Sequence, residues 1–502
     1  MTNVDSDTGV LAREQRMLID GELRYTDSGA LFDVVHPASE QVAGQATDGT
    51  VTDVERATTA ARRAFDTTDW SRDVEFRHHC LRQLQEALTA EQERLRRIVI
   101  TEVGCPVSVT GSQIESPIAE VGHWAEHGRA FDYLVDTGVH ETPLGPARRK
   151  IQYDPVGVVG AITPWNVPFY LNIAETVPAL MAGNTVVLKP AQLTPWSGTE
   201  LGRIVAEKTD IPAGVFNVVT SNANEVGAAL SADPRVDMIT FTGSTATGRA
   251  ILAAGAPTVK KTLLELGGKS THIICDDADF AACLPMAGMM ACVMSGQSCI
   301  LSSRVLLPRS RYAEGIEVLK TIMENFPVGD PWTPGIMQGP QISETQRQKT
   351  LGLVQSAVAD GATLVDGRVL RKADAYGKHL FHHYDGRRVV HIHLGLYGTF
   401  TEAPVPLPLP VGQVRMRMVG TEYGTDLRGP TVCEVLAESE IPDVVAKLGA
   451  DPLRGDADPA LAWKRINKSR RPIGALLMDQ SVIAGVGNVY RSELLFRHRI
   501  DP

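Results

Sequence analysis

Residues 236–248 read VDMITFTGSTATG, and this stretch sets the architecture that we expect for most of the chain. Residues 236–242 form a short β-branched run, and residues 243–248 form a turn that carries two glycines and begins a helical pattern. The first N–H groups of a helix have no partner inside the helix, so a turn of this kind can hold a phosphate group. A single pair of glycines is weak evidence, and the surrounding sequence has to support it.

Four other short apolar runs share this design, because each is followed by a turn and then by a helical pattern. They are VGVVGAITP (156–164), NTVVLKP (184–190), FNVVT (216–220) and THIICDD (271–277). Upstream, apolar residues recur at helical spacing between residues 51 and 103, which predicts surface helices followed by a polar connector. Buried strands that alternate with helices predict a doubly wound, Rossmann-like α/β domain.

Length and composition indicate a folded chain of several domains. The 502 residues exceed one ordinary core, and 43% hydrophobic with 22% charged residues is a globular balance. The net charge of -10 argues against a protein that coats nucleic acid through its overall field. The charge is uneven, however, because residues 365–502 hold 19 Lys and Arg against 16 Asp and Glu, whereas the residues before them hold 30 against 43. The chain therefore changes character near residue 365.

The seven cysteines predict a reducing environment. They are odd in number and scattered, and they contain no CxxC pair, which disfavours a disulfide framework and a cysteine-based zinc site. The first residues, MTNVDSDTGVLAREQ, contain neither a basic nor an apolar region of a signal peptide, and no apolar run reaches the ~18 residues needed to cross a bilayer. We therefore expect a cytoplasmic protein without a membrane partner.

Three residues are candidates for covalent chemistry. Cys299 lies in SGQSCILSSR, where glycine and serine give the backbone freedom to present the sulfur to a cleft. Glu265 lies between leucines, and an apolar setting raises the proton affinity of a carboxylate and suits it to general-base work. Asn166 follows a predicted strand in TPWNVPF, and its amide can donate to a developing oxyanion. Each also has a purely structural interpretation, namely a buried cysteine, a carboxylate paired with Lys269, and a turn residue.

The chain also offers the parts of a cofactor site. Lys189 ends a predicted buried strand in VVLKPAQLTP, where its ammonium can bond ribose hydroxyls at the carboxyl edge of the sheet. Gly243 and Gly248 surround the helix start described above. Together these pieces indicate a dinucleotide site.

Residues 17–364 resemble the aldehyde dehydrogenase superfamily, because PWN, LKPA, FTGSTATG, LELGGKS and GQSC occur in the family's order and spacing. The resemblance implies oxidation of a small-molecule aldehyde to a carboxylic acid through a cysteine thioester, with NAD or NADP as cofactor. It implies Cys299 as nucleophile, Glu265 as the base that activates the deacylating water, and Asn166 with the Cys299 N–H as oxyanion donors. The residues implied to hold the cofactor are Trp165, Lys189, Gln192, Gly243, Ser244 and Gly248.

Two departures from the family pattern affect what this part can do. Family members that prefer NAD often carry Glu where this chain has Gln192, so NAD and NADP both stay open. The family segment EEIFGPV, which contacts the nicotinamide ribose and ring, does not occur after Leu364. The resemblance therefore implies a truncated α/β catalytic domain, without the family's C-terminal strand, and leaves the oligomeric state open.

Residues 365–502 carry a second set of motifs. AYGKHLFHHY contains Lys378, HIHLGLYG presents Leu396 and Tyr397 in a tight turn, and SVIAGVGNVYRSEL places Asn488 after a Gly-x-Gly turn. Free N–H groups in such a turn can hold a phosphate oxygen, although ordinary turn chemistry also explains each motif alone. Together they resemble the formamidopyrimidine/endonuclease VIII family of DNA glycosylases, including its helix-two-turn-helix element. The resemblance implies phosphate contacts from Lys378 and Asn488, and it implies that Leu396 and Tyr397 fill the gap left by a flipped base.

This second resemblance is also partial. Family members begin with Met-Pro-Glu and use the proline amine as nucleophile, whereas this chain begins MTNVD, and HRIDP stands where the family's zinc finger would follow. We therefore expect no zinc or other metal, weak salt-dependent DNA binding and no glycosylase activity from this part. The predicted divisions are a dinucleotide-binding domain (1–265), a partial catalytic domain (266–364), and a small α+β part made of a β-rich domain (365–436) and a helix-two-turn-helix segment (437–502).

The leading hypothesis for function is an NAD(P)-dependent aldehyde dehydrogenase-type oxidoreductase fused to an incomplete DNA-glycosylase-like module. One alternative is a damaged-DNA-binding protein of the base-excision repair type. The other is a fusion that is inactive in both parts.

Overall fold

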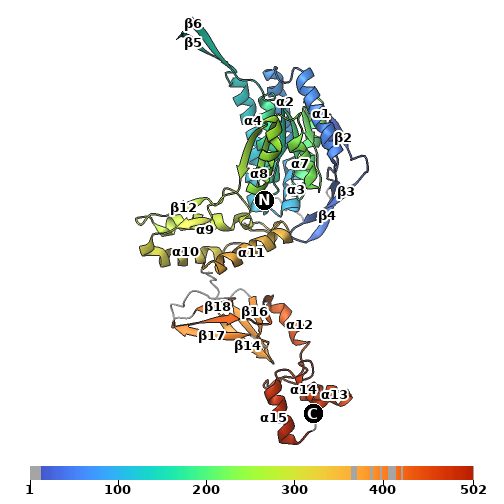
Figure 1. Ribbon diagram of the computed structural model, residues 1–502, viewed down its shortest axis with the longest axis vertical. Helices are drawn as coiled ribbons and strands as arrows, with labels where there is room; N and C mark the ends of the chain where they lie inside the picture. Colours follow the sequence, from blue (N-terminus) through green and yellow to red (C-terminus); the bar gives the residue numbers. More distant parts are fainter. Residues whose placement is uncertain are drawn as a thin grey trace. The chain divides into compact units, whose positions relative to one another are not determined.

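The computed structural model describes residues 13–362, 370–384, 388–395, 398–404, 414–419 and 422–500. The chain forms two compact units, Met1–Gln348 and Lys349–Pro502 (Figure 1). The division falls inside helix α11 (Glu344–Ala359), upstream of the change in composition near residue 365.

The first unit is built on a seven-stranded sheet with the order β11-β10-β7-β8-β9-β1-β2. The strands from β11 to β9 run parallel, whereas β1 pairs antiparallel with β9 and with β2. β7, β8 and β9 are buried almost throughout, as their β-branched sequences predict. The bounds are β1 Met17–Ile19, β2 Glu22–Arg24, β7 Val158–Ile162, β8 Thr185–Lys189, β9 Phe216–Val218, β10 Met238–Gly243 and β11 Lys261–Leu266.

Helices cover both faces of this sheet (Figure 1). α1, α7 and α8 lie on one face, over a core that includes Val187, Ile239 and Ile251. α5 and α6 lie on the other face, with α2 and α4 packed behind them. This arrangement confirms the doubly wound α/β fold and the helices expected between residues 51 and 103. The bounds are α1 Val51–Thr67, α2 Val74–Ala90, α3 Gln92–Val103, α4 Glu115–Ala130, α5 Pro168–Met181, α6 Trp196–Lys208, α7 Asn224–Ala232 and α8 Thr245–Gly255.

Two segments of the first unit have a structure that differs from the one predicted from the sequence. The predicted polar connector contains a long hairpin of β5 (Leu134–Thr142) and β6 (Gly145–Gln152), which projects from the unit (Figure 1). Most of its residues are exposed on both faces, so the alternation that reveals a half-buried strand is absent. The run at 271–277 forms β12 (Thr271–Ile273), which pairs with β13 (Arg304–Leu306) in a separate sheet.

The remaining elements of the first unit flank the main sheet. α9 (Phe280–Cys292) and α10 (Tyr312–Glu324) pack with β12 and β13 around a small core of Ile274, Phe280 and Leu284. The other short elements are the hairpin of β3 (Leu31–His36) and β4 (Gln41–Thr47) and the 3-10 turns at Val107–Ser112, Val293–Gly296, Ala256–Thr258 and Arg309–Arg311.

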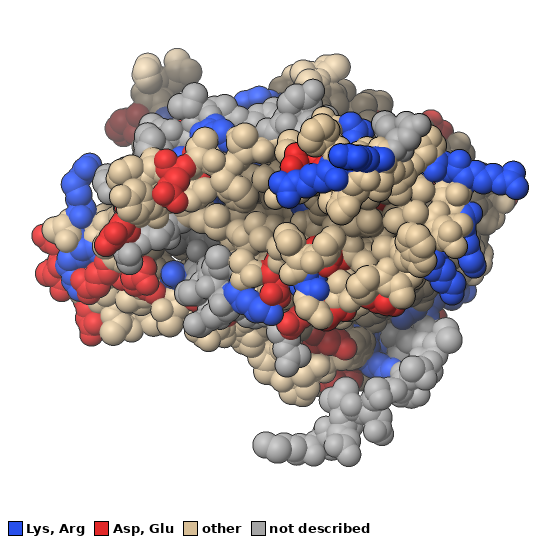
Figure 2. Space-filling view, turned by 90° about the horizontal axis from the view of Figure 1, so that it is seen from below, with Lys and Arg blue, Asp and Glu red and all other residues tan. Residues whose placement is uncertain are grey.

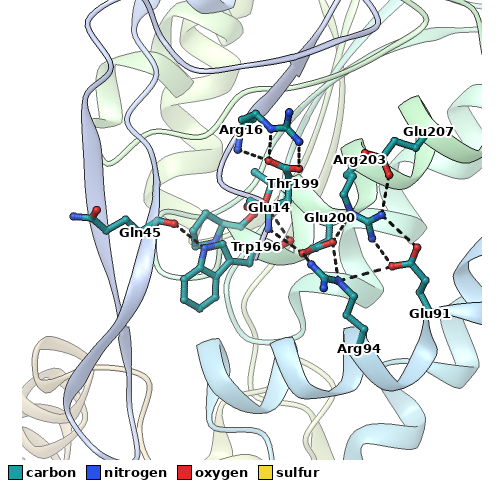
Figure 3. Close-up of polar contacts among 11 residues, drawn as sticks. Glu14, Arg16, Gln45, Glu91, Arg94, Trp196, Thr199, Glu200, Arg203 and Glu207 are labelled. Carbon is teal, nitrogen blue, oxygen red and sulfur yellow. Dashed lines mark hydrogen bonds and ion pairs between the residues drawn. The ribbon is translucent and has the colours of Figure 1, made fainter. Parts of the chain in front are cut away.

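A buried ionic network ties α3, α6 and the residues before β1 together (Figure 3). The Glu200 side chain is 0% exposed and accepts hydrogen bonds from Arg94, from Arg203 and from the backbone N–H of Glu14. Arg203 also pairs with Glu91 and Glu207. Three segments that are distant in sequence are therefore held by one buried carboxylate.

In the part that the structure describes, the second unit combines two small sheets with the end of α11 and with the shorter helices that follow the sheets. One sheet has the order β14-β15-β16-β20, and the other has the order β17-β19-β18. α14 and α15 pack together around Leu477, Val486 and Leu495. This is the α+β arrangement expected for the end of the chain. The bounds are β14 Leu370–Tyr376, β15 His379–Tyr384, β16 Arg388–His393, β17 Thr399–Pro404, β18 Val414–Val419, β19 Tyr423–Arg428, β20 Val432–Ala437, the 3-10 turn Glu438–Glu440, α12 Ile441–Val445, α13 Pro459–Lys468, α14 Ile473–Met478 and α15 Asn488–His498.

Candidate functional site

A cleft of about 640 Å³ opens at the carboxyl ends of β7, β8 and β10. Open parallel sheets bind ligands at this edge, outside the ends of the strands. Five of the residues predicted to hold a cofactor line the cleft together. They are Trp165, Lys189, Gln192, Gly243 and Ser244.

The turn at residues 243–248 forms one wall of this cleft. Ser244 is the N-cap of α8, and its hydroxyl accepts a hydrogen bond from the N–H of Thr247 at 3.1 Å. Gly248, the remaining predicted cofactor residue, packs α8 against β11, because a Cβ at this position would lie 2.9 Å from Leu266 Cδ2. The start of α8 therefore faces the cleft with the free N–H groups that suit a phosphate.

Lys189 is the buried cation of the cleft. Its side chain is buried at the end of β8, and Nζ donates to the carbonyl of Pro190 at 3.0 Å. Burial lowers the pKa of Lys189 to about 8, because the ammonium loses solvation. Its remaining N–H groups can serve a ligand in the cleft.

Cys299 is exposed, in the turn that follows the 3-10 segment Val293–Gly296. Asn166 reaches this loop, because its Nδ2 donates to the carbonyl of Gln297 at 2.8 Å. The structure therefore brings the predicted oxyanion donor to the loop of the predicted nucleophile. One N–H of the Asn166 amide is used in this contact, and the amide has a second.

The expected apolar setting of Glu265 is wrong. Glu265 lies near the end of β11, and its side chain is exposed. Leu264 and Leu266 flank it in sequence, but successive side chains of a strand point to opposite faces, and these leucines pack with the core under α8. Neighbouring leucines in a strand therefore do not bury the residue between them.

The residues that shape the loop of Cys299 were not predicted from the sequence. Met294 and Ser295 have φ angles of 52° and 59°, in the left-handed region that non-glycine residues rarely adopt. Gln297 holds the strained turn, because its Nε2 donates to the carbonyls of Met294 and Pro340, and its Oε1 accepts from Ile342 N–H. Strain of this kind clusters at functional sites, but only coordinates reveal it.

The second unit brings two of the predicted DNA-binding residues together. Gly377, at φ 59°, packs against Ala484 and Gly485, and its N–H donates to Asp451 Oδ2 at 2.7 Å. As a result, Lys378 Nζ lies 3.7 Å from where a Cβ on Gly487 would be. Gly487 caps α15, whose first residue is Asn488. Leu396 and Tyr397, predicted to fill the gap of a flipped base, lie outside the described residues.

A stack of three histidines lies beside Lys378, and sequence reasoning missed it. The rings of His379 and His393 are 4.5 Å apart and nearly parallel, and His379 Nδ1 shares a hydrogen bond of 2.8 Å with His391 Nε2. His391 Nδ1 in turn contacts Glu434 Oε1 at 2.9 Å. Burial, together with the two neighbouring histidines, lowers the pKa of His379 to about 4. His379 and His393 are register partners on β15 and β16, and His391 lies two residues before His393 on β16. All three side chains therefore point to the same face of the sheet.

Comparison with known proteins identifies the larger part of the chain. Residues 25–382 match the aldehyde dehydrogenase family. The chain belongs to the aldehyde dehydrogenase family. A 3-succinoylsemialdehyde-pyridine dehydrogenase from a Pseudomonas species is 37% identical over 350 residues, which are 70% of this chain and 71% of that enzyme.

Solved structures of aldehyde dehydrogenases share the fold of this part. Aldehyde dehydrogenase C from Pseudomonas syringae, a mutant in complex with NAD+ and octanal, has 34% identity and a TM-score of 0.66, with 74% of each chain covered. Betaine aldehyde dehydrogenase from Staphylococcus aureus, in complex with NAD+, has 29% identity and a TM-score of 0.67, with 74% of this chain and 72% of that chain covered.

The end of the chain matches a second family. Residues 448–502 match the formamidopyrimidine-DNA glycosylase H2TH domain. Endonuclease 8 1 from Mycobacterium tuberculosis is 72% identical over 152 residues, which are 30% of this chain. The chain spans 57% of the length of that endonuclease. Both resemblances stated from the motifs are thus confirmed.

Charge on the surface of the protein is mixed. Figure 2 shows one face, on which Lys and Arg lie in several separate groups with acidic and uncharged residues between them. This distribution agrees with the net charge of -10. Among the described residues, no helix combines the length and apolar character needed to cross a membrane. All seven cysteines are free thiols.

Proposed function

We propose that the chain is an NAD(P)-dependent oxidoreductase that converts an aldehyde to a carboxylic acid through a thioester on Cys299. The observation that carries this proposal is the cleft at the end of β8 and β10, where Lys189, Ser244 and Trp165 line one cavity. Membership of the family and the NAD+ complexes of similar structures support it.

The residues of this chain fit the steps of such a reaction. The Cys299 thiolate adds to the carbonyl carbon, and the free N–H of the Asn166 amide together with the Cys299 N–H stabilises the developing oxyanion. Bound NAD or NADP supplies the acceptor for the hydride that leaves this carbon. Glu265 then takes a proton from the water that attacks the thioester, and the acid leaves as the thiolate is restored.

Binding of the cofactor is the first test. Lys189→Met is expected to weaken NAD binding about tenfold, because a hydrogen bond from a charged donor contributes about 1.5–3 kcal/mol. The affinity of the unaltered chain should fall as the pH rises through about 8, because Lys189 loses its proton there. Fluorescence titration with NAD and with NADP measures both effects.

Lys208→Met is the matched control, because Lys208 is an exposed lysine in the last turn of α6. Equal affinities in the two variants would contradict the role of Lys189. We expect binding to be easier to detect than turnover, since the segment EEIFGPV is absent from the sequence. A displacement of about 1 Å in a reacting group can cost on the order of a hundredfold in rate.

Several finer features belong to the same proposal. Gln192 is uncharged where NAD-preferring relatives carry Glu, so we infer that both NAD and NADP are accepted. A cytoplasmic location is supported by the seven free thiols. We also propose that the chain divides into a cofactor-binding part (1–265), a partial catalytic part (266–364) and two glycosylase-like parts (365–436 and 437–502). We propose no zinc site in these parts.

A second candidate function, weak DNA binding, is favoured by the position of Lys378 beside Gly487 and Asn488. An ammonium next to the start of an 11-residue helix suits a phosphate group. The basic residues Lys468, Arg470 and Arg471 lie 17 to 20 residues before Asn488, at the end of α13 and after it. Lyase chemistry is not part of this proposal.

We expect the DNA affinity to depend on Lys378 and on salt. Lys378→Ala should weaken binding to an abasic-site duplex about tenfold, and the slope of log K against log salt should become shallower by about one. Lys372→Ala is the control, because Lys372 is an exposed lysine of β14 that pairs with Asp374 at 2.7 Å. Electrophoretic shifts at several salt concentrations measure the slope. A covalent protein–DNA band after borohydride treatment that disappears in Lys378→Ala would contradict the proposal and indicate an enzyme.

A further inference from the structure

Glu175 is a partly buried carboxylate that no motif predicted and no step above uses. It lies on α5, on the face of the main sheet opposite α8. Its Oε2 accepts a hydrogen bond from Thr240 Oγ1 at 2.8 Å, and its Oε1 accepts one from Thr242 Oγ1. Both threonines belong to β10, so Glu175 is held against the strand that leads into the cofactor cleft.

The sheet register places Glu265 on the same side as Glu175. β10 and β11 are parallel neighbours in which Thr242 is the partner of Glu265. Register partners point to the same face, and Thr242 points toward Glu175 on α5. Leu264 and Leu266 point to the other face, as shown by their contacts with the core under α8. The Thr242 hydroxyl, which donates to Glu175, therefore points to the same face of the sheet as the Glu265 side chain on the neighbouring strand.

The electrostatics of this pair agree with the geometry. Burial raises the pKa of Glu175 to about 7, the hydrogen bonds from Thr242 and Thr240 oppose this shift, and the neighbouring carboxylate of Glu265 adds to it. Glu265 is the charged group that acts on Glu175. Glu175 can therefore gain and lose a proton near neutral pH, unlike an ordinary glutamate.

We propose that Glu175 is the proton acceptor of Glu265, and that the proton passes through the hydroxyl of Thr242. This inference deepens the function proposed above and rests on it. Glu175 acts through Glu265 and does not touch the substrate, so it is a positioning residue for proton transfer. The motifs of the chain do not include it, because its partners are on β10 and become neighbours only in the fold.

Water adds to the thioester carbon, and one of its protons moves to the Glu265 carboxylate as the new C–O bond forms. The C–S bond then breaks, which restores the Cys299 thiolate and releases the acid. Glu265 passes its proton to Thr242 Oγ1, which gives its own hydroxyl proton to Glu175. Glu265 is then ionised for the next turnover, and Glu175 returns the proton to solvent.

Hydrolysis of p-nitrophenyl acetate tests this step without a cofactor. The burst of p-nitrophenolate reports acylation of Cys299, and the steady rate reports deacylation. We expect Glu175→Gln to keep the burst amplitude, to lower the steady rate at least about tenfold at pH 7, and to remove the rise of that rate with pH near 7. Glu175→Asp, which keeps an ionisable group, should restore part of the rate and the pH dependence.

Glu120→Gln is the matched control, because Glu120 is a carboxylate on neighbouring α4 that accepts a hydrogen bond from Tyr170 Oη at 2.8 Å. It should leave both phases unchanged. An unaltered steady rate and pH profile in Glu175→Gln would overturn the proposal. Equal loss of the burst and the steady rate would also overturn it, since that result indicates a structural role.

A second measurement separates this inference from the proposed function. In protein labelled with carbon-13 at the glutamate carboxyls, we expect the Glu175 signal to titrate near pH 7, apart from the signal of Glu102, whose pKa burial raises to about 8. The two are told apart because only the first depends on Glu175. The Glu175 signal should be lost in Glu175→Gln and should titrate at lower pH in Glu265→Gln. If the unaltered chain gives no burst, the role of Cys299 is wrong, and the titration still decides whether the two carboxylates are coupled. A Glu175 signal that titrates with ordinary glutamates near 4.3 overturns the inference.

Discussion

Cys299→Ser is expected to lower the burst and the steady rate of p-nitrophenyl acetate hydrolysis by at least ~10³-fold. A serine hydroxyl remains protonated at neutral pH, whereas a cysteine supplies a useful fraction of thiolate and is intrinsically more nucleophilic. Oxidation of an aldehyde by NAD should fall by at least as much, because it needs the same nucleophile. Stopped-flow absorbance of p-nitrophenolate measures both phases.

Cys275→Ser is the matched control, because Cys275 is the other exposed cysteine of the chain. It should leave both phases unchanged. Burial raises the pKa of Cys80 and of Cys105 to about 12, so these thiols should react slowly. Mass mapping of alkylated protein should find Cys299 labelled first and protected by NAD. Label on Cys80 or Cys433 before Cys299 would mean that the active site is not formed.

The main sheet and the cofactor cleft could be predicted from the sequence because their signals are local. A β-branched run followed by a glycine turn marks a strand, its carboxyl end and a helix start within a dozen residues. Lys189, Gly243 and Ser244 therefore come together at one edge, as expected from their places at strand ends. The same logic fails for Glu265, whose flanking leucines face the opposite side of β11.

Features that depend on register or on strain could not be predicted. Glu175 meets Thr240 and Thr242 only because α5 crosses β10, and nothing in their sequence spacing indicates it. The left-handed Met294 and Ser295 give no signal, since neither residue type favours that conformation. The hairpin of β5 and β6 is exposed on both faces, so its strands lack the alternation that would reveal them.

We expect loss of the Glu200 carboxylate to lower the stability of the first unit. Glu200 is 0% exposed, and its partners Arg94 and Arg203 are 30% and 14% exposed. Figure 3 shows the guanidinium groups of Arg94 and Arg203 converging on this carboxylate. Removing one partner of a buried ion pair costs more than the pair contributes, because the remaining charges stay desolvated and unpaired.

Glu200→Ala should therefore destabilise the first unit by about 3 kcal/mol and lower its melting temperature by about 5 °C. Glu200→Gln keeps the shape of the side chain and one acceptor oxygen but loses the charge. It should therefore cost less stability than the alanine variant. Glu344→Ala is the control, because its ion pair with Arg347 is 64% and 54% exposed, and exposed pairs contribute about 0–1 kcal/mol. Differential scanning calorimetry measures all three variants. Equal melting temperatures for Glu200→Ala and Glu344→Ala would contradict this prediction. In that case Glu91 and Glu207, which also pair with Arg203, compensate for the lost carboxylate. No single group of the network would then hold α3 and α6 together.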